Sequence, residues 1–152
     1  MTDTSTPETG RFENKILSLP VRVYYEDTDF SGVVYHANYL KFFERGRTEY
    51  LRAMGMRHSE LAAGDDPGAF VVARMELDFK RPARIDDALL IETRISKMRG
   101  PRVFFDQRAL RGEELICAAS VMVVAISMDG RPRRLSAEDA ARWQAHIIDP
   151  DS

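Results

Sequence analysis

The spacing of apolar residues changes along the chain, and each spacing predicts a different element. Val21, Val23 and Tyr25 alternate with the residues between them, which is the period of a strand. Over residues 38–54 the interval becomes three or four, which is the period of one helix face. A strand, a loop and a long helix are therefore expected in the first part of the chain. The positions on that helix face are Leu40, Phe43, Arg47, Tyr50, Leu51 and Met54.

Most of the remaining chain predicts strands. Over residues 70–79 apolar and charged residues alternate, as in a strand with one buried face. Turn-forming residues separate three further segments, near 88–98, 102–110 and 114–128. The last is almost wholly apolar, which fits a strand buried on both faces, although a buried helix would show the same run. The predicted inward face of the first segment is Val71, Ala73, Met75, Leu77 and Phe79.

This order of elements predicts the fold class. Ser136 and Asp139 have the spacing of a capping box and begin a short final helix. The long helix over 38–54 is the natural cover for the apolar face of the sheet. We therefore expect an α+β fold in which a curved antiparallel sheet wraps around one helix. Residues 1–14 are expected to be a flexible tail, and 15–148 a single domain.

Three residues give the expected details of the long helix. Asn38 is the expected N-cap, and Gly55 is a suitable residue just beyond the C-terminus. Gly46 lies in the middle of the helix, where glycine costs about 1 kcal/mol relative to alanine. We interpret Gly46 as a position where the helix backbone packs closely against the sheet.

The composition narrows the classes of function. With 22 basic and 24 acidic residues among 152, the net charge of −2 argues against a general nucleic-acid binder. The longest apolar run, 115–126, is shorter than the roughly 20 residues of a transmembrane helix, and the polar first residues do not resemble a signal peptide. Cys117 is the only cysteine, and the three histidines lack the spacing of metal ligands. We expect a cytoplasmic protein without metal or cofactor.

Charge is distributed unevenly. Residues 74–111 carry ten basic and six acidic side chains. A solvated edge that discourages aggregation is one explanation, and a binding site for phosphates is the other. The basic candidates are Lys80, Arg81 and Arg84 in one group and Lys97, Arg99 and Arg102 in the other.

Acidic residues lie in a turn-rich segment just before the long helix. An aspartate there is ionised at neutral pH and could act as a base or nucleophile. The free N–H groups of a helix start could stabilise an oxyanion. On spacing alone, a structural aspartate turn followed by an N-cap is the favoured explanation of the segment.

The run from Asp27 to Arg52, which begins D-T-D-F-S-G-V-V-Y-H-A-N-Y-L, resembles the acyl-CoA thioesterases of the 4-hydroxybenzoyl-CoA thioesterase-like hotdog superfamily. The Tol–Pal-associated group is the most similar. The resemblance continues through residues 79–83 and the strand pattern to about Leu135. It implies the hotdog fold, hydrolysis of acyl-CoA, and dimers that pair into tetramers with sites shared between subunits.

The resemblance also implies site residues. Asp29 matches the catalytic aspartate, as nucleophile or general base, and we expect its carboxylate to face the helix start beside a cleft. The segment from Gly32 through Val33 enters the helix, and the N–H of His36 matches the donor that polarises the thioester carbonyl. The His36 imidazole either orients substrate or shapes the loop, and Tyr35 either lines the acyl pocket or packs. Lys80, Arg81 and Arg84, or Lys97, Arg99 and Arg102, are implied to hold the phosphates of coenzyme A.

Two other functions fit the same segment. One is a non-catalytic module that binds acyl-CoA or an acyl carrier protein. The other is a hotdog dehydratase using His36 and Glu44, which would leave the Asp29 loop unexplained. The acyl-chain preference cannot be derived from the sequence, since one methylene changes discrimination by only about 1–3 kcal/mol.

Overall fold

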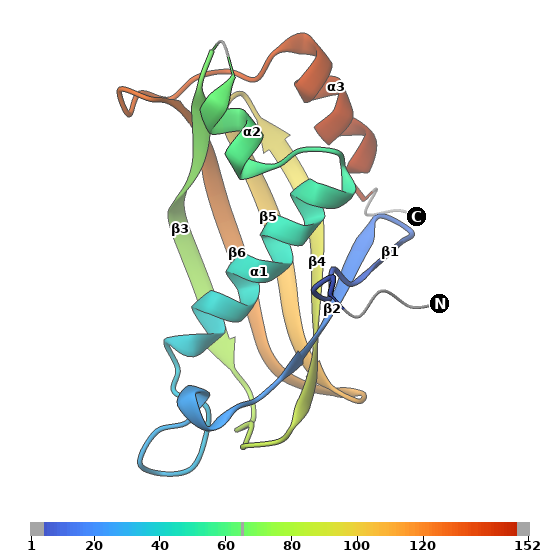
Figure 1. Ribbon diagram of the computed structural model, residues 1–152, viewed down its shortest axis with the longest axis vertical. Helices are drawn as coiled ribbons and strands as arrows, with labels where there is room; N and C mark the ends of the chain where they lie inside the picture. The colour runs from blue at the N-terminus through green and yellow to red at the C-terminus, as the bar shows by residue number, and fades with distance from the viewer. Residues whose placement is uncertain (1–4, 65, 149–152) are drawn as a thin grey trace.

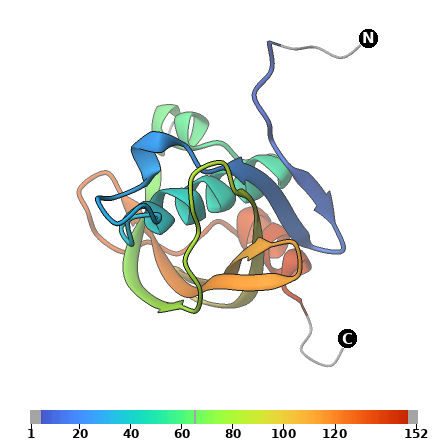
Figure 2. The same ribbon diagram turned by 90° about the horizontal axis from the view of Figure 1, so that it is seen from below.

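The computed structural model describes residues 5–64 and 66–148. They form one six-stranded antiparallel sheet that curves around the helix α1 (Figures 1 and 2). The strand order is β1-β2-β4-β5-β6-β3, so β3 lies at one edge. The expected fold class is therefore confirmed. The elements are β1 (Arg11–Glu13), β2 (Ile16–Arg22), a 3₁₀ turn η1 (Tyr25–Asp27), α1 (Asn38–Ala53), α2 (His58–Ala63), β3 (Gly68–Phe79), β4 (Ala88–Arg99), β5 (Arg102–Arg111), β6 (Glu114–Ser127) and α3 (Ala137–His146).

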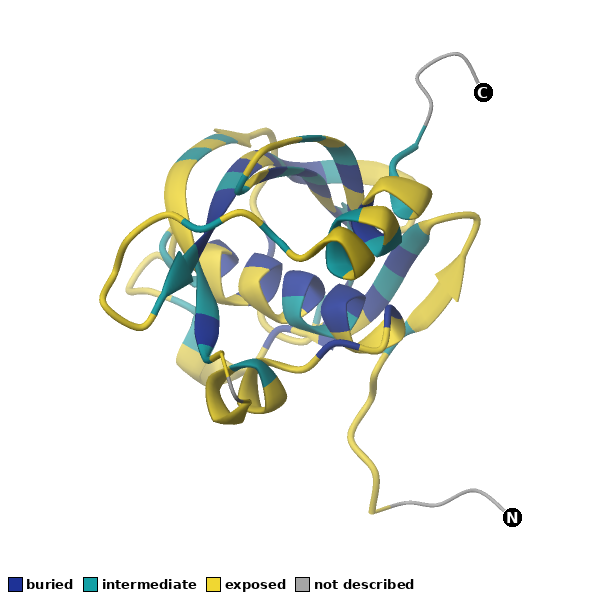
Figure 3. Cartoon of the chain, turned by 90° about the horizontal axis from the view of Figure 1, so that it is seen from above, coloured by how far each residue is buried: buried dark blue, intermediate teal, exposed yellow. Residues whose placement is uncertain are grey.

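The core lies between α1 and the concave face of the sheet. Buried residues alternate along the strands and follow one face of α1 (Figure 3). Phe42, Phe43 and Tyr50 of α1 are almost completely buried, as are Ile91 and Phe105 of the sheet. Burying a side chain of this size stabilises a fold by about 1.5–3 kcal/mol, so this layer is what holds the sheet in its curved shape.

At Gly46 the backbone of α1 packs closely against side chains of the sheet. A Cβ atom there would lie 2.5 Å from Thr93 Oγ1 and 3.0 Å from Gln107 Nε2. Gln107 Nε2 donates hydrogen bonds to Thr93 Oγ1 and to the Phe43 carbonyl, both at 2.8 Å. Glycine leaves room for this buried polar contact, so the interpretation of Gly46 is confirmed.

The helix termini follow the expectations only in part. Asn38 is not the N-cap: it is the first residue of α1, and its Nδ2 donates to the Asp27 carbonyl at 2.8 Å. Gly55 has a φ of 84°, the left-handed conformation expected just beyond a helix. The Ser136 hydroxyl accepts a hydrogen bond from the Asp139 N–H at 3.1 Å, which confirms the capping of α3.

The beginning of the chain differs from the expectation in two ways. The strand predicted around 21–26 lies earlier, at Ile16–Arg22, because the chain turns into η1 at Tyr25. Arg11–Glu13, which was expected to be part of a tail, forms β1 and pairs with β2. The hairpin closes through Asn14 and Lys15, both with positive φ. Of that expected tail, residues 1–4 lie outside the described part of the chain.

The predicted inward face of β3 is wrong in its first half. The register with β6 shifts between Val72 and Arg74, which marks a β-bulge. Before the shift, Phe70 and Val72 line a cavity beside α1 and Val71 does not, although both valines are partly exposed to solvent. After it, Met75 packs against the core as predicted. A single extra residue thus reverses the alternation, which no period-of-two pattern can show.

Candidate active site

A short loop before α1 carries Asp29. The Asp29 N–H donates to the Val33 carbonyl at 2.9 Å, and the Gly32 N–H donates to the Asp29 carbonyl at 3.0 Å. Gly32 has a φ of 82°, which this tight turn requires and which glycine adopts without strain. The loop projects from the molecule beside the first turn of α1 (Figure 1). It is therefore a backbone-built turn with a carboxylate at its base.

Two contacts fix this loop to the rest of the protein. The Val34 N–H donates to the Ala83 carbonyl at 2.8 Å, and Val33 forms a bridge with Arg84. On the helix side, the Asp27 carbonyl accepts hydrogen bonds from the Tyr35 N–H and from the Asn38 side chain. The segment after β3 thus lies against the loop, and the loop is anchored to the start of α1.

The Asp29 carboxylate is held by a residue two positions away. Its Oδ1 accepts a hydrogen bond from the Ser31 N–H at 2.9 Å and one from the Ser31 hydroxyl at 2.5 Å. The Ser31 hydroxyl is the main cause that lowers the pKa of Asp29 below its usual value. The group is therefore ionised at neutral pH, and both hydrogen bonds distinguish Oδ1 from Oδ2.

The start of α1 offers two unused donors. The first helical hydrogen bonds begin at Asn38, whose N–H donates to the Tyr35 carbonyl at 2.8 Å. Among the described residues, the N–H groups of His36 and Ala37 have no hydrogen-bond acceptor. Such groups carry partial positive charge and suit a developing oxyanion.

Two aromatic rings lie beside the exposed His36 imidazole. Its centroid lies 4.5 Å from that of Tyr35 and 6.3 Å from that of Phe79 at the end of β3. Phe79 in turn contacts Tyr39 of α1. These contacts place the imidazole in a row of aromatic rings next to the helix start.

The chain alone does not enclose this site. Asp29, Ser31, Tyr35 and His36 are all exposed, so the cleft that we expected beside Asp29 is not formed by one chain. Phe30, at the tip of the loop, is also fully exposed. A reaction that must exclude water therefore needs a further surface over the loop.

The structure separates the two basic groups. Lys80, Arg81 and Arg84 follow β3 and lie at the end of the sheet that carries the Asp29 loop, where Val33 pairs with Arg84. Arg81 forms a long ion pair with Glu114, 3.8 Å between nitrogen and oxygen. These side chains are exposed, and they are the cations beside the candidate site.

Lys97, Arg99 and Arg102 lie at the opposite end of the sheet. Arg99 of β4 pairs with Arg102 of β5. Arg102 pairs with Val124 of β6, and Val124 pairs with Val71 near the start of β3. From Val71 to Phe79 is about 26 Å at roughly 3.3 Å per residue. The Lys97 ammonium lies over the Phe104 ring, 4.5 Å from its centroid. Within one chain, this second group is therefore remote from Asp29.

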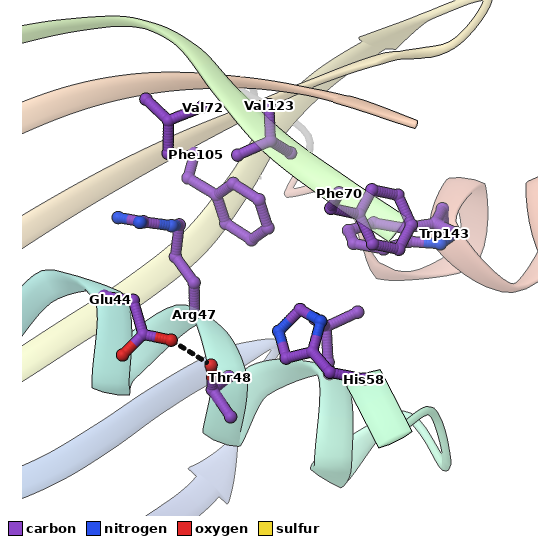
Figure 4. A pocket seen from close by; sticks show the side chains of 10 residues that line it. Glu44, Arg47, Thr48, His58, Phe70, Val72, Phe105, Val123 and Trp143 are labelled. Carbon is purple, nitrogen blue, oxygen red and sulfur yellow. Dashed lines mark hydrogen bonds between the residues drawn. The ribbon is translucent and has the colours of Figure 1, made fainter. Parts of the chain in front are cut away.

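A cavity of about 120 Å³ lies between α1, α2 and the sheet (Figure 4). Glu44, Arg47 and Thr48 contribute to it from α1, and His58 from α2. The sequence pattern placed Arg47 on the buried face of the helix but gave it no role. A positively charged residue on an otherwise apolar helix face was the feature that could have indicated one. The apolar lining comes from Leu51, Phe70, Val72, Phe105, Val123 and Trp143.

The described residues show no metal site beside these features. In the part of the chain that the structure describes, no three His, Cys, Asp or Glu side chains gather closely enough to hold a metal ion. No helix there combines the length and apolarity needed to cross a membrane. Cys117 is buried in β6, and burial raises the pKa of its thiol to about 12, so it is a core residue.

Comparison with known proteins identifies the family. The profile of the family described as "Thioesterase superfamily" matches residues 31–118, more than half of the chain. The chain belongs to the thioesterase superfamily. Among curated relatives of this thioesterase, the acyl-CoA thioesterase YbgC of Haemophilus influenzae is 45% identical over 73% of this chain and 81% of its own. The acyl-CoA thioester hydrolase YbgC of Escherichia coli is 45% identical over 82% of this chain and 93% of its own.

Solved structures agree with this assignment. A probable thioesterase from Bartonella henselae is 50% identical, with a TM-score of 0.78 over 80% of this chain and 99% of its own. A hypothetical protein from Thermus thermophilus has a TM-score of 0.81 at 22% identity and supports the fold alone. The hotdog resemblance is therefore confirmed, and this chain is a thioester hydrolase.

Proposed function

We propose that this thioesterase hydrolyses acyl-CoA to a carboxylic acid and free CoA at the Asp29 loop. The observation that carries the proposal is an ionised carboxylate fixed by Ser31 in the loop that leads to two unused N–H groups at the start of α1. Acyl-CoA is the substrate class in the names of the YbgC relatives. Asp29 lies just before the segment that the family profile matches, so its role rests on this geometry.

The chemistry requires few groups. Asp29 Oδ2 either attacks the thioester carbonyl carbon, giving a mixed anhydride that water then hydrolyses, or removes a proton from an attacking water. In both routes the carbonyl oxygen gains negative charge and accepts hydrogen bonds from the His36 and Ala37 N–H groups. The C–S bond then breaks and the thiolate leaves. A thiol of pKa about 8.5 leaves readily, so no strong general acid is needed.

The residues around Asp29 bind the two parts of the substrate. The rings of Tyr35, His36 and Phe79 form the apolar wall along which the acyl group lies. Lys80, Arg81 and Arg84 attract the phosphates of CoA, since they occupy the same end of the sheet as Asp29. Gly32 and Val33 position the loop through their backbone.

A second copy of the chain completes the site in this proposal. β3 is a twelve-residue edge strand, and Val71, Val72 and Phe79 on it are exposed. Long apolar edges rarely remain uncovered, because they pair with other chains. Antiparallel pairing of β3 with its copy would place the far end of one sheet beside the Asp29 loop of the other. That arrangement would cover the loop and bring the partner's second basic group to the same end of a dimer, which could pair further into a tetramer.

The test is thiol release from short-chain, long-chain and aromatic CoA esters by the wild-type protein and Asp29→Asn. We expect turnover of at least one ester by the wild type and near-complete loss in the variant. Glu26→Gln is the matched control, because it removes an exposed carboxylate nearby and should retain activity. The exposure of Asp29 in the single chain favours one rival, a non-catalytic acyl-CoA binding module. Thioester binding without thiol release on any ester would establish that rival.

A further inference from the structure

The cavity between α1, α2 and the sheet contains a cation without an anionic partner. Arg47 is only 8% exposed. Its Nη1 donates to Gln107 Oε1 at 3.0 Å, and among the described residues Arg47 forms no ion pair with a carboxylate. A guanidinium has five N–H donors, so most of its hydrogen-bonding capacity is unused. A buried charge in this condition is costly unless something neutralises it.

The nearest acid does not fill this role. Glu44 also lines the cavity, one turn earlier on α1, but it is exposed and its Oε1 accepts a hydrogen bond from Thr48 Oγ1 at 2.7 Å. Its charge acts on Arg47 only at longer range. Burial accordingly lowers the pKa of Arg47, and the effect of Glu44 opposes this. The Arg47 guanidinium therefore has no carboxylate from the described residues in direct contact with it in this cavity.

The remaining walls suit an apolar body. In Figure 4, Arg47 and His58 approach the cavity from the helices, whereas Val72, Phe105 and Val123 line it from the sheet. An engineered apolar cavity of roughly 150 Å³ accommodates benzene. A cavity of about 120 Å³ thus suits a hydrocarbon part of about five carbons, with a polar head at its edge.

We infer that this cavity binds a small carboxylic acid, with its carboxylate on the Arg47 guanidinium and its hydrocarbon part against Val72, Phe105 and Val123. A carboxylate accepts two parallel hydrogen bonds from a guanidinium, which is the geometry that an under-used arginine offers. His58 at the rim adds a further donor. The inference does not depend on the role of Asp29, although the acid released by a thioesterase belongs to the same chemical class.

Trp143 provides a direct measurement. It is the only tryptophan of the chain and lines the cavity. Sodium hexanoate, titrated into the full-length protein at constant ionic strength, should change the tryptophan fluorescence with saturation. The neutral match, 1-hexanol, should bind at least tenfold more weakly. Equal binding of the two, or no saturable change with hexanoate, overturns the inference.

Two variants identify the binding group. Arg47→Gln should weaken hexanoate binding at least tenfold and leave 1-hexanol binding unchanged. Val72→Met keeps Arg47 but narrows the cavity from a half-exposed strand position, so it should weaken both ligands even if Arg47→Gln fails to fold. If Arg47→Gln instead dissociates a dimer and hexanoate never binds, the anion is a carboxylate of a second copy and the inference is wrong. Because the titration measures binding and not thiol release, its outcome is independent of the test of the proposed function.

Discussion

Asp29 and Arg47 are two charged groups that the fold treats in opposite ways. Asp29 is exposed and receives its hydrogen bonds from Ser31, two positions along the chain. Arg47 is buried and depends on Gln107, sixty positions away. Hydrogen bonds within a local turn can therefore hold a carboxylate in place and keep it ionised, without any contact with the core. The orientation of a buried guanidinium, in contrast, requires the whole helix–sheet contact.

The largest expected effect comes from removing the charge of Asp29, the group that is fixed by its local turn. Asp29→Asn keeps the shape of the turn and removes the charge, so thiol release should fall by about 10²–10⁴-fold, the usual contribution of a positioned base. Thermal stability should change little, because the side chain is exposed. Steady-state kinetics and a melting curve on the same preparation check both points. A comparable rate in the variant contradicts the catalytic role of Asp29.

The next largest effect comes from disturbing the contact between α1 and the sheet. Gly46→Ala places a methyl group 2.5 Å from Thr93 Oγ1, and forcing an atom into a packed core costs about 1–3 kcal/mol. Denaturant unfolding should show this loss in the free energy of unfolding. Gly64→Ala is the matched control, since its Cβ would lie 3.6 Å from the nearest atom, the Glu60 carbonyl oxygen. Equal stability of the two variants would show that the contact at Gly46 is not tight.

A third experiment compares the two ends of the sheet. Replacing Lys80 and Arg84 together by alanine should raise KM for acyl-CoA about three- to tenfold with kcat unchanged, because exposed ion pairs contribute about 0.2–1 kcal/mol each. The effect should shrink at high salt. The control replaces Lys97 and Arg99 in the same way. A larger rise in KM from that control would show that a second copy's far end holds the phosphates.

The smallest expected effect tests the influence of the Ser31 hydroxyl on Asp29. The Ser31 hydroxyl lowers the pKa of Asp29, and activity requires the ionised form, so activity is lost as pH falls through that lowered value. Ser31→Ala raises the pKa, so the loss should begin at a higher pH while the rate at neutral pH changes less than tenfold. Ser31→Thr keeps the hydroxyl and should restore the wild-type profile. An unchanged acid limb of kcat/KM in Ser31→Ala would mean that the hydroxyl has no electrostatic role.

The local patterns of the sequence predicted much of this molecule. The period of α1, the glycine at 46 and the capping of α3 by Ser136 all follow from residues close together in the chain. The Asp29 segment also stood out, because turn formers and acids precede a helix. The β1–β2 hairpin and α2 were missed, since positive φ at Asn14 and Lys15 and a helix of six residues leave weak signals.

The sequence by itself determined the order of elements, the family and the turn that presents Asp29, because each depends on neighbours within a few residues. Tertiary structure alone decided which basic group lies beside that turn, where β3 reverses its face, and what surrounds Arg47. Those outcomes depend on strand register and on packing between segments dozens of residues apart. A period or a motif contains no information about such distances, so only the folded chain could reveal them.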